Sequence, residues 1–71
     1  MSAAETYASY SWGMEAGWRY GAASIRRYGL PYAVYAVRRA HSNAGGQETP
    51  HMQGWLRGAG DAVLSALNLE V

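Results

Sequence analysis

Residues 12–22 read WGMEAGWRYGA, and a glycine recurs in them at every fourth position, at Gly13, Gly17 and Gly21. A glycine inside a helix costs about 1 kcal/mol relative to alanine, so three glycines on one helical row need a compensating contact. Positions spaced by four form a ridge on a helix, and without side chains that ridge becomes a groove which another backbone can approach closely. We therefore expect a second helix to lie directly against this row.

A second row of small residues with the same spacing lies nearer the C-terminus, at Gly54, Gly58, Ala62 and Ala66. On both helices the small residues flank the apolar arc on the same side. Two arrangements satisfy this pattern. The two rows pack on each other within one chain, or one row packs on a second copy or on a different subunit. The sequence alone leaves this choice open.

Capping signals predict where the helices begin and end. Ser2 followed by Glu5 is a capping box that opens a helix over about 3–28, and Gly29 with Pro31 ends it. Pro31 opens a short middle helix over about 31–41, closed by Arg38, Arg39 and His41, and residues 42–49 form a loop. Thr49 and Pro50 open a third helix over about 50–68. We expect one all-α domain spanning residues 1–71, a small helical hairpin or three-helix arrangement.

The periodicity also predicts which faces are buried. The first and third helices are amphipathic, whereas the middle helix is apolar around its circumference, so we expect it to be buried. On the first helix the apolar arc contains Tyr7, Tyr10, Met14, Trp18, Gly21, Ile25 and Tyr28. On the third helix it contains Met52, Trp55, Leu56, Ala59, Val63 and Leu67.

Size and composition favour a role in assembly. A chain of 71 residues buries only about 60% of its unfolded surface, and with no cysteine it has no disulfide to stabilise it. It has six tyrosines, three tryptophans and six arginines but no lysine, a balance typical of protein interfaces. Partners are expected to be further copies of the chain or larger protein subunits, contacted through Trp12, Trp18, Tyr20, Arg26, Arg27, Tyr28 and Trp55.

Other functions find less support in the sequence. His41 and His51 have only Glu48 as a nearby acidic residue, so we expect no metal site. No catalytic or cofactor-binding motif is recognised either, so we expect no cofactor and no catalysis. Nucleic-acid binding, or inhibition through an arginine–tyrosine face, is the alternative, and it is not favoured because both arginine pairs are placed to cap helix ends. No segment is apolar enough to span a membrane, although contact with a membrane surface stays open. The segment MSAAETYASY lacks the features of a signal peptide, and the localisation is not indicated.

Residues 17–31, GWRYGAASIRRYGLP, resemble a segment of subunit e of the mitochondrial F-type ATP synthase. The resemblance covers only this stretch, and Glu15 and Arg19 stand where that family has a membrane-spanning helix. It implies a setting in which such a glycine row serves assembly. From the glycine rows and the tyrosine, tryptophan and arginine content we expect a small, non-enzymatic structural or accessory subunit that joins a larger complex, in an organelle membrane or in a virus particle.

Overall fold

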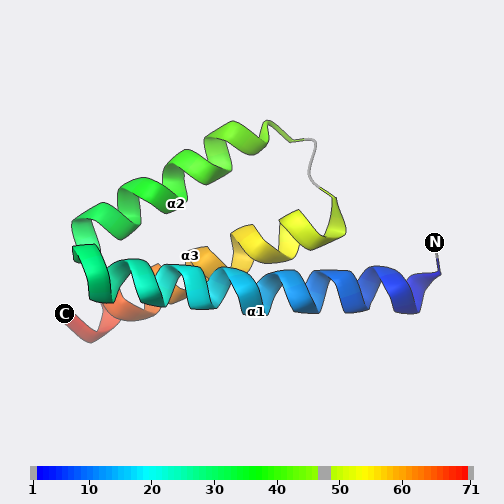
Figure 1. Ribbon diagram of the computed structural model, residues 1–71, viewed down its shortest axis with the longest axis horizontal. Coiled ribbons are helices and arrows are strands. Elements are labelled where there is room, and N and C mark those ends of the chain that lie inside the picture. Colours follow the sequence, from blue (N-terminus) through cyan, green and yellow to red (C-terminus); the bar gives the residue numbers. More distant parts are fainter. Residues whose placement is uncertain (1, 47–48, 71) are drawn as a thin grey trace.

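The computed structural model describes the backbone of residues 2–46 and 49–70, and the side chains of these residues except 69 and 70. It contains three helices, α1 (Ala3–Tyr28), α2 (Leu30–Ala44) and α3 (Pro50–Glu70), as Figure 1 shows. No strand occurs in the described part of the chain. The prediction of an all-α fold is therefore confirmed.

The side-chain caps at two helix starts are those that the sequence predicts. The Ser2 hydroxyl accepts a hydrogen bond from the Glu5 N–H at 3.2 Å, and the Ser2 N–H donates to the Glu5 carboxylate at 3.4 Å. At the start of α3, the Thr49 hydroxyl accepts a hydrogen bond from the Met52 N–H at 3.2 Å. Each cap satisfies a backbone donor that the first helical turn leaves unpaired.

A single residue, Gly29, joins α1 to α2. Its N–H donates to the Ile25 carbonyl at 2.9 Å, and its carbonyl accepts from the Ala33 N–H at 3.2 Å, so Gly29 ends one helix and begins the next. Its backbone angles, φ 93° and ψ 163°, belong to a region that essentially only glycine adopts. The chain therefore reverses within one residue.

Helix α2 is longer than predicted. The expected limits were 31–41, with a loop over 42–49, but α2 begins at Leu30 and continues to Ala44. The predicted end lay at the cations Arg38, Arg39 and His41. The helix ends instead where the chain can enter the left-handed conformation, at Gly45 with φ 64°. Of the predicted loop, residues 47–48 lie outside the described residues.

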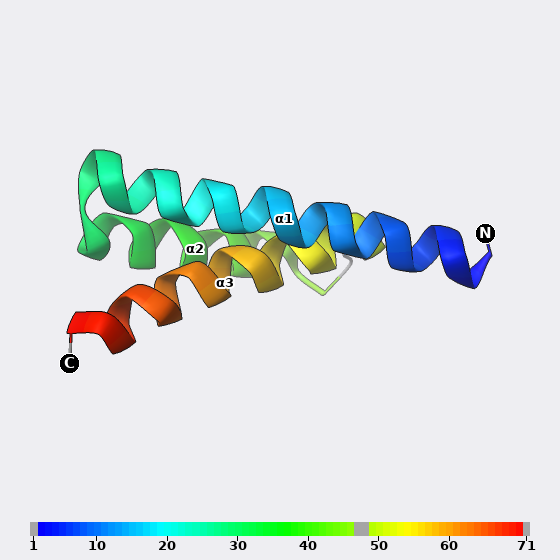
Figure 2. The same cartoon turned by 90° about the horizontal axis from the view of Figure 1, so that it is seen from below.

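Helices α1 and α3 lie side by side and run in the same direction, while α2 runs back between their ends (Figures 1 and 2). The register shows the direction: Gly13 faces His51 and Trp55, and Gly17 faces Trp55 and Ala59, so the positions on both helices rise together. Most of the contact between elements is between α1 and α3. Helix α2 supplies the return that a parallel pair requires.

Glycines allow the two backbones to touch. A Cβ on Gly13 would overlap the His51 carbonyl oxygen and would lie 3.0 Å from the Trp55 nitrogen. Conversely, a Cβ on Gly54 would overlap the Tyr10 carbonyl oxygen. Because a hydrogen occupies this direction in glycine, each such residue points a Cα–H at a carbonyl of the other helix. Contacts of this kind contribute about 0.5–1 kcal/mol each, which is comparable to the cost of a helical glycine.

The core is small and consists of short side chains. Its buried hydrophobic members are Ala33, Val37, Leu56, Ala59, Ala62 and Val63. Among the described residues no large side chain is fully buried. The buried residues of α1 are all small: Gly13, Gly17, Gly21 and Ser24.

The prediction that the middle helix is buried was wrong, and the apolar arc of α1 is only partly buried. On that arc Tyr7, Trp18 and Tyr28 are exposed, because the glycine row beside it forms the contact with α3. Its remaining members are buried or half-buried: Tyr10, Met14, Gly21 and Ile25. On α2 only Ala33 and Val37 are buried. The other faces of α2 remain open, since only one side of this helix meets the α1–α3 pair.

Candidate functional site

Most residues of the two small-residue rows lie in the close contact between α1 and α3. Gly13, Gly17, Gly21, Gly54, Gly58 and Ala62 are all buried, and Ala66 is half-buried. A Cβ on Gly17 would overlap the Trp55 carbonyl oxygen, and one on Gly58 would overlap the Met14 carbonyl oxygen. Within this chain the two rows therefore face each other, and no second copy has access to the glycines.

The aromatic residues proposed as partner contacts do not form one patch. Trp12 is 68% exposed and Trp18 is 45% exposed, both on α1. Trp55 is half-buried and its ring packs against that of Tyr20, with centroids 4.9 Å apart. Tyr28 packs instead against Tyr32 of α2, with centroids 4.7 Å apart. Only the last pair lies at the joint between α1 and α2.

Helix α2 contributes exposed residues that were not among the predicted partner contacts, although the sequence places them in the alternative arginine–tyrosine face. Tyr32 and Tyr35 project outward from the helix, and the Arg39 Nη1 donates a hydrogen bond to the Tyr35 hydroxyl at 3.0 Å. The spacing of these three residues by three and four marks one helical face, while Ala33 and Val37 mark the opposite one. That alternation was visible in the sequence, but the overall apolar character of the segment concealed it.

Arginines fall into two groups. Arg19 pairs with Glu15 at 2.6 Å, and Arg57 pairs with Asp61 at 3.1 Å. The hydrogen bond and the charge of Asp61 raise the pKa of the Arg57 guanidinium above its ordinary value. The four remaining arginines are exposed and pair with no carboxylate among the described side chains: Arg26, Arg27, Arg38 and Arg39.

One argument against an arginine-based site was wrong. Arg26 and Arg27 do lie in the last turn of α1, where cations suit the helix dipole. Arg38 and Arg39, however, are not in the last turn of α2, because that helix continues to Ala44 and only His41 lies in its last turn. Capping therefore explains one arginine pair and leaves the other without a structural role of this kind.

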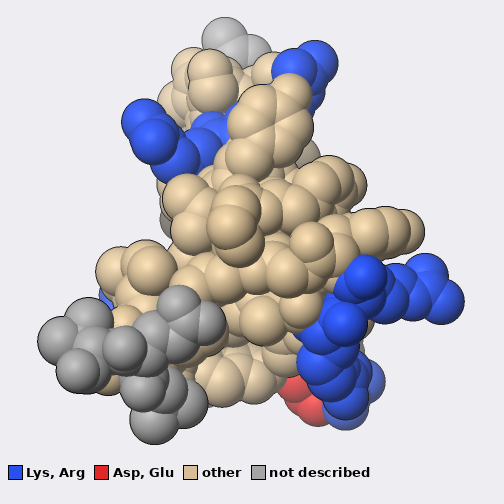
Figure 3. Space-filling view, turned by 90° about the vertical axis from the view of Figure 1, so that its left-hand side faces the viewer, with Lys and Arg blue, Asp and Glu red and all other residues tan. Residues whose placement is uncertain are grey.

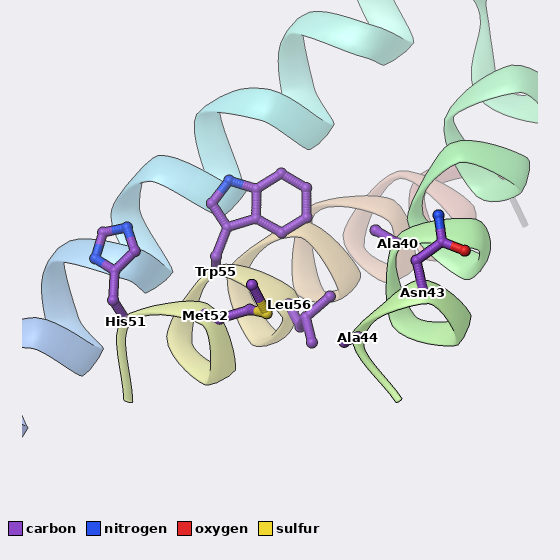
Figure 4. Close-up of a pocket in the computed structure, with 7 residues that line it drawn as sticks. All are labelled: Ala40, Asn43, Ala44, His51, Met52, Trp55 and Leu56. Carbon is purple, nitrogen blue, oxygen red and sulfur yellow. The ribbon is translucent and has the colours of Figure 1, made fainter. Parts of the chain in front are cut away.

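Between α2 and the start of α3 the structure has an open groove of about 360 Å³, which Figure 4 shows. Its walls are mainly apolar, and the Trp55 indole extends from α3 toward α1. It is lined by Ala40, Asn43, Ala44, His51, Met52, Trp55 and Leu56. A further groove of about 520 Å³ between the same helices exposes Leu64 and Leu67 beside Arg38 and His41. Both surfaces suit apolar contact more than chemistry.

The described residues contain no cluster of three metal-ligating side chains. The His41 Nδ1 lies 2.9 Å from the Val37 carbonyl oxygen of its own helix. In the same part of the chain, none of the helices has a window apolar and long enough for a membrane span.

Comparison with known proteins gives no further assignment. The chain matches no protein-family model, and neither a curated protein nor a solved structure matches it. The resemblance to subunit e covers only residues 17–31.

Proposed function

We propose that the chain is a small, non-enzymatic subunit that assembles with other proteins through its exposed aromatic side chains. Its setting would be a larger complex, either in an organelle membrane or in a virus particle. The glycine rows support this role indirectly: they hold α1 and α3 together and leave the large side chains outside. The observation that carries the proposal is the reversal of the usual distribution, with alanine, valine and glycine inside and aromatic residues outside.

The extent of exposed apolar surface supports a partner. Seven large aromatic side chains of α1 and α2 are exposed: Tyr7, Trp12, Trp18, Tyr20, Tyr28, Tyr32 and Tyr35. Tyrosine and tryptophan are enriched at interfaces because they add much contact area with few rotatable bonds. Met52, Leu64 and Leu67 of α3 are also exposed and add to the exposed apolar area. A surface of this composition is more typical of a subunit than of an isolated monomer.

The total accessible area points the same way. The chain exposes 5030 Å². A compact monomer of 7.7 kDa would expose about 4,300 Å². The excess of about 700 Å² reflects an elongated molecule, with extents of 40 × 22 × 20 Å, which leaves more surface open to a partner. The exposed start of α1, which extends beyond α3 in Figure 2, contributes part of it.

A second candidate function, binding of nucleic acid, is favoured by one observation. Arg26, Arg27, Arg38 and Arg39 carry charges that no described carboxylate neutralises. Phosphate groups bind such cations and tyrosine rings accept bases. We rank this function second because the net charge is only +1 and because phosphate contacts would leave Leu64 and Leu67 uncovered.

The proposed function is tested on the assembly recovered from its source. Native mass spectrometry gives its mass, and hydroxyl-radical labelling compares it with the isolated chain. We expect a mass above that of one chain and reduced labelling of Trp12, Tyr28 and Tyr35, while half-buried Trp55 changes little. A native mass of one chain, with all four side chains labelled as in isolation, would contradict the proposal.

A further inference from the structure

The end of the molecule at the α1–α2 joint has a charge that the sequence total conceals. Arg26 and Arg27 lie in the last turn of α1, and Arg38 and Arg39 lie further along α2. Figure 3 looks at this end and shows arginine side chains separated by an uncharged surface. Although the net charge of the chain is +1, two adjoining helices thus carry four arginines that pair with no carboxylate among the described side chains.

Three tyrosines belong to the same two helices. Tyr28 and Tyr32 pack ring to ring across the joint at an interplanar angle of 52°, and Tyr35 accepts a hydrogen bond from Arg39. One groove, of about 290 Å³, is lined by Arg27, Tyr28 and Tyr32 together with Tyr20, Ala23 and Ser24. Another contains Tyr35, Arg38 and Arg39. We call the set Arg27, Tyr28, Tyr32, Tyr35, Arg38 and Arg39 the arginine–tyrosine surface. Arg26 lies outside it, in a groove that also contains Ala62 and Ala66 of α3.

The joint fixes this surface before any partner binds. Gly29 alone connects the two helices, and it is hydrogen-bonded on both sides, to Ile25 and to Ala33. The contacts between the Tyr28 and Tyr32 rings and between Tyr35 and Arg39 further order the side chains. Because ordering side chains is one of the main costs of association, a surface ordered in advance binds more tightly.

The chemistry of the surface selects the kind of partner. A guanidinium group pairs with carboxylates and with phosphates, so the arginines require an acidic partner but do not identify it. A protein is favoured over a nucleic acid because the net charge is only +1 and because the exposed apolar residues Leu64 and Leu67 line the same groove as Arg38. A second copy of the chain is disfavoured, since a symmetric contact here would bring like charges together.

We propose that the arginine–tyrosine surface binds an acidic segment of a protein partner, with carboxylates on its three arginines and apolar or aromatic side chains against the three tyrosines. This inference rests on the proposed function and specifies the partner that one part of the surface accepts. The carboxylates would make charge-assisted hydrogen bonds to the guanidinium groups, and the tyrosines would lose contact with water.

The experiment uses the full-length chain and a random glutamate–tyrosine copolymer as the acidic probe, with binding measured by fluorescence anisotropy. Two variants remove arginines of this surface, Arg27→Gln and Arg38→Gln/Arg39→Gln. The matched control, Arg19→Gln/Arg57→Gln, removes the same charge as the double variant from arginines that are already paired with Glu15 and Asp61. Circular dichroism checks that all three variants keep the helix content of the parent chain.

We expect each test variant to weaken binding of the copolymer by about tenfold or more, and the control to weaken it much less. Equal losses in test and control variants would overturn the proposal, because they would indicate general charge attraction. Absence of copolymer binding, or tighter binding of a single-stranded oligothymidylate that falls steeply with salt, would also overturn it. If the acidic probe fails while radical labelling of the native assembly still shows protected aromatics, the proposed function stands and only this inference falls.

Discussion

Gly17 and Trp55 meet backbone to backbone, and the direction in which a Cβ would leave Gly17 is filled by the Trp55 carbonyl oxygen. The relationship is reciprocal along the α1–α3 pair, because Gly58 of α3 stands in the same way against Met14 of α1. The compensation for glycine in these helices is therefore contact between backbones, and the stability of the fold depends on it.

The first prediction concerns this contact. Gly17→Ala should lower the free energy of unfolding by about 2–3 kcal/mol, because α3 has to move away to admit the methyl group. Gly60→Ala is the matched control, since the nearest atom to its Cβ is the His41 Cε1 at 3.9 Å. The control should gain about 0.5–1 kcal/mol from helix propensity. Urea unfolding followed by circular dichroism measures both, and changes of the same sign would contradict the contact.

The second prediction concerns the joint. Gly29→Ala should lower the free energy of unfolding by about 1–3 kcal/mol, because φ 93° with ψ 163° is strained for alanine. Gly45→Asn, at φ 64° and ψ 19°, occupies the left-handed region that asparagine tolerates, so it should cost less. Thermal unfolding gives the comparison. Near-ultraviolet circular dichroism should also report a disturbed Tyr28–Tyr32 pair only in the Gly29 variant.

The third prediction separates two similar helix caps. Ser2 and Thr49 each accept one backbone N–H at 3.2 Å, but the residues after Ser2 are exposed, whereas after Thr49 the His51 carbonyl lies against Gly13 of α1 and Gly54 is buried. Thr49→Ala should therefore lower global stability by about 1 kcal/mol. Ser2→Ala should leave the unfolding midpoint nearly unchanged and accelerate amide hydrogen exchange in the first turns of α1. Equal effects on the midpoint would refute this reasoning.

The fourth prediction concerns the tryptophans of the isolated chain. In a Trp18→Phe/Trp55→Phe variant only Trp12 remains, and its exposed indole should be quenched by acrylamide more strongly than Trp55 in a Trp12→Phe/Trp18→Phe variant. The reason is that Trp12 is 68% exposed, whereas Trp55 is half-buried against Tyr20. Stern–Volmer slopes measure the difference. A steeper slope for Trp55 would show that the Tyr20 contact does not form in solution.

Local signals in the sequence predicted the helices well where a chemical group marks the boundary. The capping box at Ser2 and the Thr49 cap predicted the starts of α1 and α3, because these hydrogen bonds form within one turn. The end of α2 was missed because Ser42 and Asn43, which follow the cations, have modest helix propensity. Ala44 favours the helix, and only Gly45 permits the turn that stops it.

Sequence by itself determined that this protein forms helices and that Gly13, Gly17, Gly54 and Gly58 admit close backbone contact. Periodicity could not determine which face is buried, since it shows where apolar residues lie but not what they touch. The tertiary structure decided that the glycine rows face each other in parallel, which leaves Tyr7, Trp18 and Tyr28 exposed beside them. The physical reason is that a backbone can approach a row without side chains more closely than an aromatic stripe, and the tight joint at Gly29 and the return of α2 bring the second row to the first.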